Sequence, residues 1–94
     1  MNERSLLLTN FPKNLIVNDA FVMDLCKEHG DKNVIIDNIF IKDCLMGKHI
    51  ENRNPVGYVI VEFENTKHVD AVKRGLWKHW IQDKLLKMRT LKDV

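Results

Sequence analysis

The cysteines and histidines of this sequence, the residue types most often found in zinc sites and in activated-nucleophile sets, are few and scattered. There are two cysteines and four histidines, at Cys26, Cys44, His29, His49, His68 and His79. Their spacing matches neither a zinc site, nor a disulfide framework, nor a Cys–His or Ser–His–Asp set. The sequence also lacks a glycine-rich phosphate loop. We therefore expect no metal, no cofactor and no enzymatic activity, with Cys26 a small buried hydrophobe.

Aromatic rings on predicted strands are the other side chains that could bind a ligand. In the segment Val56–Phe63, "VGYVIVEF", β-branched residues alternate with period two. Gly57, Val59, Val61 and Phe63 then share one face, and Tyr58 points to the other face with Ile60 and Glu62. Phe40 stands between Ile39 and Ile41. It joins the face of Tyr58 if those isoleucines are buried, and is a core ring if the strand has the opposite register.

Length and composition favour one globular domain over residues 1–94, with a core of about residues 5–91. The chain has 94 residues, 45% hydrophobic and 30% charged, with a net charge of +2. This mildly basic balance is compatible with nucleic acid but does not by itself indicate it. No apolar run is long enough for a bilayer span, and the N-terminus lacks the apolar stretch of a secretion signal. We therefore expect no membrane partner and an intracellular location.

The first half of the chain predicts strand, helix, strand. A strand over Ser5–Asn10 is stopped by Pro12, and Asn18 caps a helix that ends at Gly30. On that helix, Val22, Leu25, Cys26 and His29 fall on one face at helical spacing. A turn or bulge at positions 37–38 precedes a strand from about Ile39 to Asp43.

The second half of the chain predicts strand, helix, strand again, after a loop over residues 44–55. The strand Val56–Phe63 is followed by a helix that Asn65 caps, which ends at Gly75 or continues to about Trp77. A last strand within residues 84–91 alternates Leu86 and Met88 with Lys87 and Arg89.

This element order predicts the α+β class, a ferredoxin-like β-α-β-β-α-β sandwich. Four antiparallel strands form one layer and two helices cover one of its faces. Leu6 and Leu8 belong to the core, and Leu7 and Thr9 to the uncovered face. An uncovered sheet face has to be polar, occluded or functional.

With these segments in place, the sequence resembles the RNA recognition motif family over roughly Ser5 to Leu91. The family's third-strand octamer, which begins with a basic residue and carries aromatic positions, aligns with Val56–Phe63. Its first-strand hexamer aligns with Leu6–Phe11. Of the family's three aromatic positions on the uncovered face, only Tyr58 keeps a ring. Leu7 and Ile60 replace the other two, and Val56 replaces the basic residue.

The resemblance implies a domain that binds single-stranded RNA through the uncovered sheet face and acts in RNA processing or mRNA regulation. Tyr58 would stack on a base or sugar, Phe40 could add a second platform, and Leu7 and Ile60 would supply apolar contact. The cations that would meet phosphates or base edges are Lys42, Arg53, Lys87 and Arg89. Asn10, at the end of the first strand, is expected to order the following loop and not to contact RNA. This function favours the nucleus over the cytoplasm.

A protein-interaction module is the alternative. It rests on a weaker resemblance to the splicing-auxiliary-factor homology motif, which has an acidic first helix and an Arg-X-Phe sequence before its last strand. The corresponding residues here are "KHW", residues 78–80, in which Lys stands at the Arg position and Trp at the Phe position. The protein-binding surface would be the helix side around Trp80 or the aliphatic sheet residues Leu7 and Ile60. The simpler interpretation is that Trp77, Trp80 or both close the core.

Overall fold

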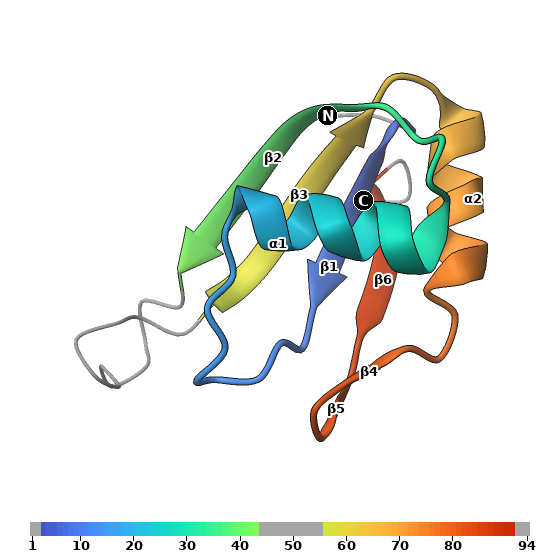
Figure 1. Ribbon diagram of the computed structural model, residues 1–94. Helices are drawn as coiled ribbons and strands as arrows, with labels where there is room; N and C mark the ends of the chain where they lie inside the picture. Colours follow the sequence, from blue (N-terminus) through green and yellow to red (C-terminus); the bar gives the residue numbers. More distant parts are fainter. Residues whose placement is uncertain (1–2, 44–55, 92–94) are drawn as a thin grey trace.

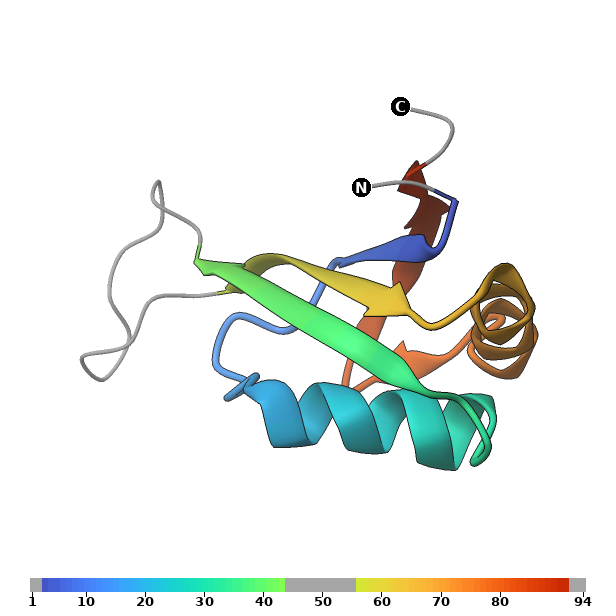
Figure 2. The same ribbon diagram turned by 90° about the horizontal axis from the view of Figure 1, so that it is seen from above.

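The computed structural model describes residues 3–43 and 56–91, and it has the predicted α+β architecture (Figure 1). A four-stranded antiparallel sheet has the order β2-β3-β1-β6, and the helices pack on one of its faces, as Figure 2 shows from above. The elements are β1 (Ser5–Thr9), α1 (Asp19–Asp24), the π-helical segment η1 (Leu25–Gly30), β2 (Ile36–Asp43), β3 (Val56–Phe63), α2 (Thr66–Gly75), β4 (Trp80–Ile81), β5 (Lys84–Leu85) and β6 (Lys87–Thr90). The predicted ferredoxin-like arrangement is confirmed.

Both helices begin where an asparagine satisfies free backbone N–H groups. The Asn18 side-chain oxygen accepts a hydrogen bond from the Phe21 N–H at 2.8 Å. The Asn65 side chain accepts from the N–H groups of Lys67 and His68, at 2.9 and 3.3 Å. An N-cap of this kind contributes about 1 kcal/mol, so two local sequence signals set the starts of α1 and α2.

The first helix departs from the expected geometry in its second half. From Leu25 to Gly30 the chain is π-helical, and the Asp31 N–H closes this segment on the Cys26 carbonyl at 2.9 Å. A π-helical segment has more residues per turn than the 3.6 of an α-helix. Of the four residues expected on one face of this helix, Val22, Leu25 and Cys26 are buried, whereas His29 is exposed.

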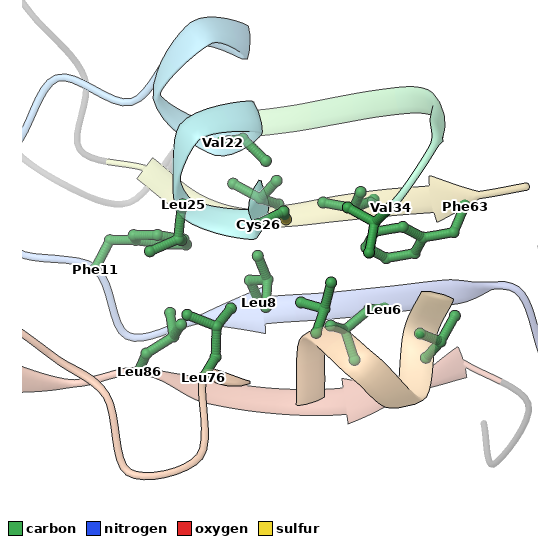
Figure 3. Close-up of a cluster of buried hydrophobic side chains, with 14 residues drawn as sticks. Leu6, Leu8, Phe11, Val22, Leu25, Cys26, Val34, Phe63, Leu76 and Leu86 are labelled. Carbon is green, nitrogen blue, oxygen red and sulfur yellow. The ribbon is translucent and has the colours of Figure 1, made fainter. Parts of the chain in front are cut away.

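The core lies between the sheet and the helices (Figure 3). Leu6 and Leu8 of β1 are fully buried there, as the strand alternation predicted. They pack with side chains of β3, α1, η1 and α2, among them Val59, Val61, Phe63, Val22, Val69 and Val72. Burial also raises the pKa of the Cys26 thiol to about 12. At neutral pH this thiol is protonated, so Cys26 acts as a small apolar side chain.

Two boundaries differ from the predicted ones. Strand β2 begins at Ile36, earlier than expected, and its register against β3 shifts between Ile36 and Asn38. The expected irregularity at positions 37–38 is thus a bulge inside the strand. An additional hairpin, β4–β5, precedes β6. Trp80 and Ile81 carried no strand prediction, Lys84 and Leu85 belong to the range predicted for the last strand, and the turn between them includes Gln82 with a φ of 56°.

The tryptophans do not close the core. Helix α2 ends at Gly75, and Leu76 takes the buried position beneath it with no exposed surface. Lys78 then adopts a φ of 57° and redirects the chain. Trp77 and Trp80 are consequently 72% and 60% exposed, so the core interpretation of this pair is wrong. Of the two helix ends considered, Gly75 is the observed one.

Candidate functional site

The uncovered face of the sheet carries one continuous row of side chains across all four strands. Phe40 of β2 pairs with Ile60 of β3, Ile60 pairs with Leu7 of β1, and Leu7 pairs with Arg89 of β6. Side chains directly opposite one another on one face lie within contact range. Four residues that are far apart in the sequence therefore form one band, and we call the surface that includes this band the open face.

A second row lies beside the first, one step along the strands. Lys42 of β2 pairs with Tyr58 of β3, and Thr9 of β1 pairs with Lys87 of β6. Because Leu8 pairs with Val59, the next position in this antiparallel register places Thr9 beside Tyr58. The open face thus holds a ring, a hydroxyl and two cations directly next to the apolar band.

The two rings of the open face are accessible. Phe40 is 53% exposed and Tyr58 is 38% exposed, while Ile39 and Ile41 pack against the core. The core alternative for Phe40 is therefore wrong. Phe40, Lys42, Tyr58 and Ile60 line a shallow hollow of about 650 Å³ together with Ile39 and Ile41. Leu7 and Ile60 are half-buried and form its apolar continuation across the sheet.

Charge is divided between the two ends of the open face. At one end the Asn38 amide donates a hydrogen bond to the Glu62 carboxylate at 2.9 Å, and Glu62 pairs with Ser5. The cations Lys42, Lys87 and Arg89 are exposed in the two rows beyond. Within residues 3–43 and 56–91, none of these three cations forms a hydrogen bond or an ion pair. Their charges are available to an anionic ligand.

Seven of the eight side chains proposed from the sequence for RNA contact are brought together on this face: Leu7, Phe40, Lys42, Tyr58, Ile60, Lys87 and Arg89. The eighth, Arg53, lies outside the described residues, as does the rest of the segment 44–55. Asn10 ends β1 with a φ of 72°, and its amide donates a hydrogen bond to the Leu85 carbonyl at 2.8 Å. It ties the end of β1 to the β4–β5 hairpin, whereas the expected contact was with the loop that follows β1.

A separate hollow of about 350 Å³ lies on the helix side of the molecule, and Trp80 is part of its wall. The other lining residues are Phe21, Asp24, Leu25, Glu28, His29, His79 and Ile81. The rings of His29 and His79 face each other with centroids 4.6 Å apart. The sequence offered no sign of this histidine pair, because its members come from η1 and from the chain after α2. Among the described residues, no group of three or more His, Cys, Asp or Glu side chains is arranged to hold a metal ion.

Because of the contact between His29 and His79, we expect the free energy of unfolding to depend on pH. Burial, and then the charge of the neighbouring His29, lower the pKa of His79 below 6.5. The unfolded chain then binds this proton more strongly than the folded one. The associated stability is present above pH 6.5 and is lost as the pH falls through the lowered folded pKa. We expect the thermal melting temperature of wild type to decrease as the pH is lowered from 6.5 through the folded-state pKa of His79. The melting temperature of His79→Gln, measured in parallel, should decrease less. An equal decrease in both proteins would contradict the assignment.

Comparison with known proteins adds evidence on the fold. No protein-family model matches the sequence, and no curated protein sequence is detectably similar to it. Solved structures do match it over nearly its whole length. The structure of the Rna15 RRM with bound RNA (GU) is 18% identical with a TM-score of 0.66, covering 93% of this chain and 81% of that one. RNA Binding Protein PG1 is 14% identical with a TM-score of 0.67, covering 93% and 92%.

A third solved structure is TcUBP1, a single RBD-unit from Trypanosoma cruzi. It is 23% identical with a TM-score of 0.54, and the match covers 93% of this chain and 55% of that one. The descriptions of the first two structures name bound RNA and RNA binding. Also among the described residues, no helix combines the length and the apolar character needed to cross a bilayer. The strand order, the helices on one face and these likenesses together show that the chain has the fold of an RNA recognition motif domain.

Proposed function

We propose that this domain binds single-stranded RNA through its open face and acts in RNA processing or mRNA regulation. The observation that carries the proposal is the meeting of two exposed rings, Phe40 and Tyr58, with Lys42, Lys87 and Arg89 on one uncovered sheet face. In the part of the chain that the structure describes, the side chains of these three cations have no hydrogen-bond or ion-pair partner. Rings of this kind stack on unpaired bases, and cations beside them meet the phosphates. The Rna15 RRM, which has this fold, carries bound RNA (GU) in its solved structure.

The proposed stacking platform lies toward one side of the sheet. Leu7 in β1 and Ile60 in β3 stand where the family has rings, so the centre of the face offers apolar contact without stacking. Phe40 and Tyr58 are diagonal neighbours on β2 and β3, since Phe40 pairs with Ile60 and Lys42 pairs with Tyr58. A base bound here would have the ammonium of Lys42 within reach of its phosphate.

The expected affinity is weak to moderate, with limited sequence specificity. The absence of rings at positions 7 and 60 lowers the stacking contribution to the binding free energy by about 2 to 6 kcal/mol, and stacking on Phe40 would restore about 1 to 3 kcal/mol of this. Stacking accepts any base, because each base has a π-face. The proposed location is inside the cell, with the nucleus favoured over the cytoplasm.

The test is a titration of the domain with a randomised pool of short single-stranded RNAs, followed through backbone amide shifts. We expect shifts on β2, β3, β1 and β6 around Tyr58, with smaller shifts on the helix side. Three phosphate contacts by Lys42, Lys87 and Arg89 would make log K fall with log salt at a slope of about −2. The absence of any shift at millimolar RNA would overturn the proposal.

Protein binding is a second candidate, favoured by the hollow beside Trp80. An indole that is 60% exposed lines a concave site with Phe21 and Ile81, and Asp24 and Glu28 give the same site acidic edges. Apolar walls with a charged edge suit an apolar side chain of a basic peptide. Amide shifts confined to α1, η1 and β4 on addition of such a peptide, without any response to RNA, would favour this candidate.

A further inference from the structure

Trp77 is an exposed ring that neither the core nor the open face uses. It follows the end of α2, directly after the buried Leu76, and 72% of its surface is accessible. Two hollows meet at this indole. One, of about 310 Å³, is lined by Lys73, Arg74 and Trp77. The other, of about 470 Å³, lies toward β5 and β6 and is lined by Lys73, Trp77, Lys78, Leu85, Leu86, Lys87 and Met88.

The surroundings of Trp77 are cationic. Among the described residues that line these two hollows, four are Lys or Arg and none is Asp or Glu. The acidic residues closest in sequence, Asp70 and Asp83, are not part of either lining. Trp80, only three positions away, has the opposite setting, because Asp24 and Glu28 share its hollow. A polyanion would therefore be attracted to Trp77 and not to Trp80.

The cations around Trp77 are only partly explained by the fold. Lys73 and Arg74 occupy the last turn of α2, where positive charge offsets the helix dipole. Lys73 also donates a hydrogen bond to the Thr90 hydroxyl at 3.1 Å, which holds its ammonium group between α2 and β6. Lys78 and Lys87 lie outside the helix, and within the described part of the chain neither forms a hydrogen bond or an ion pair.

The Trp77 surface, which consists of Trp77 with Lys73, Arg74, Lys78 and Lys87, is continuous with the open face. Lys87 belongs to both, since it pairs with Thr9 in the row that contains Tyr58 and also lines the larger hollow beside Trp77. Strand β6 is the edge of the sheet on this side, and Figure 1 shows α2 next to it. A strand of RNA that crosses the sheet from Tyr58 toward β6 would reach Trp77 by passing over this edge.

We propose that the Trp77 surface is a second contact site for the same single-stranded RNA, with Trp77 stacking on a base beyond the sheet and the four cations meeting the adjacent phosphates. This inference rests on the proposed function of the open face. A ring flanked by cations is the arrangement that holds single strands without sequence preference. The site would extend the RNA footprint and would partly compensate for the rings missing at Leu7 and Ile60.

The first test compares RNA length in wild type and variants. Randomised RNAs of about 4 nucleotides would cover the sheet only, and RNAs of about 12 nucleotides would also reach Trp77. We expect wild type to bind the longer RNA more tightly. Trp77→Ala should weaken binding of the longer RNA at least about fivefold and leave the shorter one unchanged. The matched control, Trp80→Ala, removes an exposed indole from the acidic hollow and should change neither.

The outcomes separate the two proposals. Wild type that binds neither RNA would overturn the function proposed for the open face, and this inference with it. Wild type that binds both, with Trp77→Ala unchanged on the longer RNA, would overturn only the inference. As a charge test, Lys78→Ala should reduce the salt slope for the longer RNA by about 0.7, the value of one phosphate contact on a single strand. An unchanged slope would show that Lys78 does not contact a phosphate of the RNA.

Tryptophan fluorescence gives an independent measurement that does not depend on affinity differences. In Trp80→Phe the only indole is Trp77, and the longer RNA should quench its emission. In Trp77→Phe the only indole is Trp80, and its emission should not change. Vesicles of anionic phospholipid serve as the competing polyanion. A response of Trp77 to vesicles, without any response to RNA, would overturn the inference and assign the surface to a membrane.

Discussion

The variant Phe40→Ala/Tyr58→Ala is expected to bind single-stranded RNA about 2 to 6 kcal/mol more weakly than wild type, because it loses two base-stacking rings at about 1 to 3 kcal/mol each. Both side chains are exposed, at 53% and 38%, so their removal should leave the fold intact. Binding is measured by fluorescence anisotropy or amide shifts at low salt, and circular dichroism verifies the fold. This is the largest effect that we expect from any change to the open face.

The control for this prediction keeps two rings in place. Phe40→Tyr/Tyr58→Phe exchanges the rings without removing their π-faces, and it should bind within a few-fold of wild type. If the alanine variant also bound like wild type, stacking on β2 and β3 would not hold the RNA. The apolar band of Leu7 and Ile60, or the cations alone, would then have to account for binding.

Gly75→Ala is expected to lower the free energy of unfolding by about 3 kcal/mol, although the same exchange ordinarily stabilises a helix by about 1 kcal/mol. A Cβ atom at Gly75 would meet the His29 carbonyl oxygen, and it would lie 2.5 Å from the Gly30 Cα and 2.7 Å from the Gly30 carbonyl oxygen. All three are backbone atoms, so no side chain can rotate away. The ends of α2 and η1 would have to separate. Urea denaturation measures the loss.

Gly30→Ala is the matched control for the helix contact. A Cβ atom there would lie 3.2 Å from Val72 Cα and Cγ2, a tight contact that a small shift can relieve. We expect it to destabilise the domain clearly less than Gly75→Ala does. A domain of this size is stable by about 5 to 15 kcal/mol, so both variants should still fold. A Gly75→Ala protein as stable as wild type would show that the two helix ends do not approach this closely.

These two predictions concern opposite sides of the molecule. Phe40 and Tyr58 lie on the uncovered face of the sheet, whereas Gly75 and Gly30 lie where the two helices meet. Substitutions at sites that share no contact residues have nearly additive effects on free energy. Binding of RNAs of about 4 nucleotides, which cover the open face only, should therefore be close to that of wild type in folded Gly75→Ala. A change in helix packing that altered RNA binding strongly would indicate coupling between the helices and the open face.

The sequence by itself determined the elements whose signals are local. Val56–Phe63 is a strand because its β-branched residues alternate with period two. Asn18 and Asn65 begin helices because their side chains cap free N–H groups within three residues along the chain. The order of these elements was sufficient to predict the four-stranded sheet with helices on one face. Tyr58 could be placed on the open face from the same alternation.

Only the tertiary structure decided which side chains become neighbours. Phe40 is on the open face because β2 has one particular register on β3 after the bulge between Ile36 and Asn38, and a shift by one residue would have reversed its face. The π-helical turn, the His29–His79 contact and the β4–β5 hairpin likewise depend on how separate segments pack. Trp77 and Trp80 are exposed because Leu76 fills the core and the chain turns at Lys78. Periodicity describes a segment alone, whereas register and packing depend on contacts between segments that are distant in sequence.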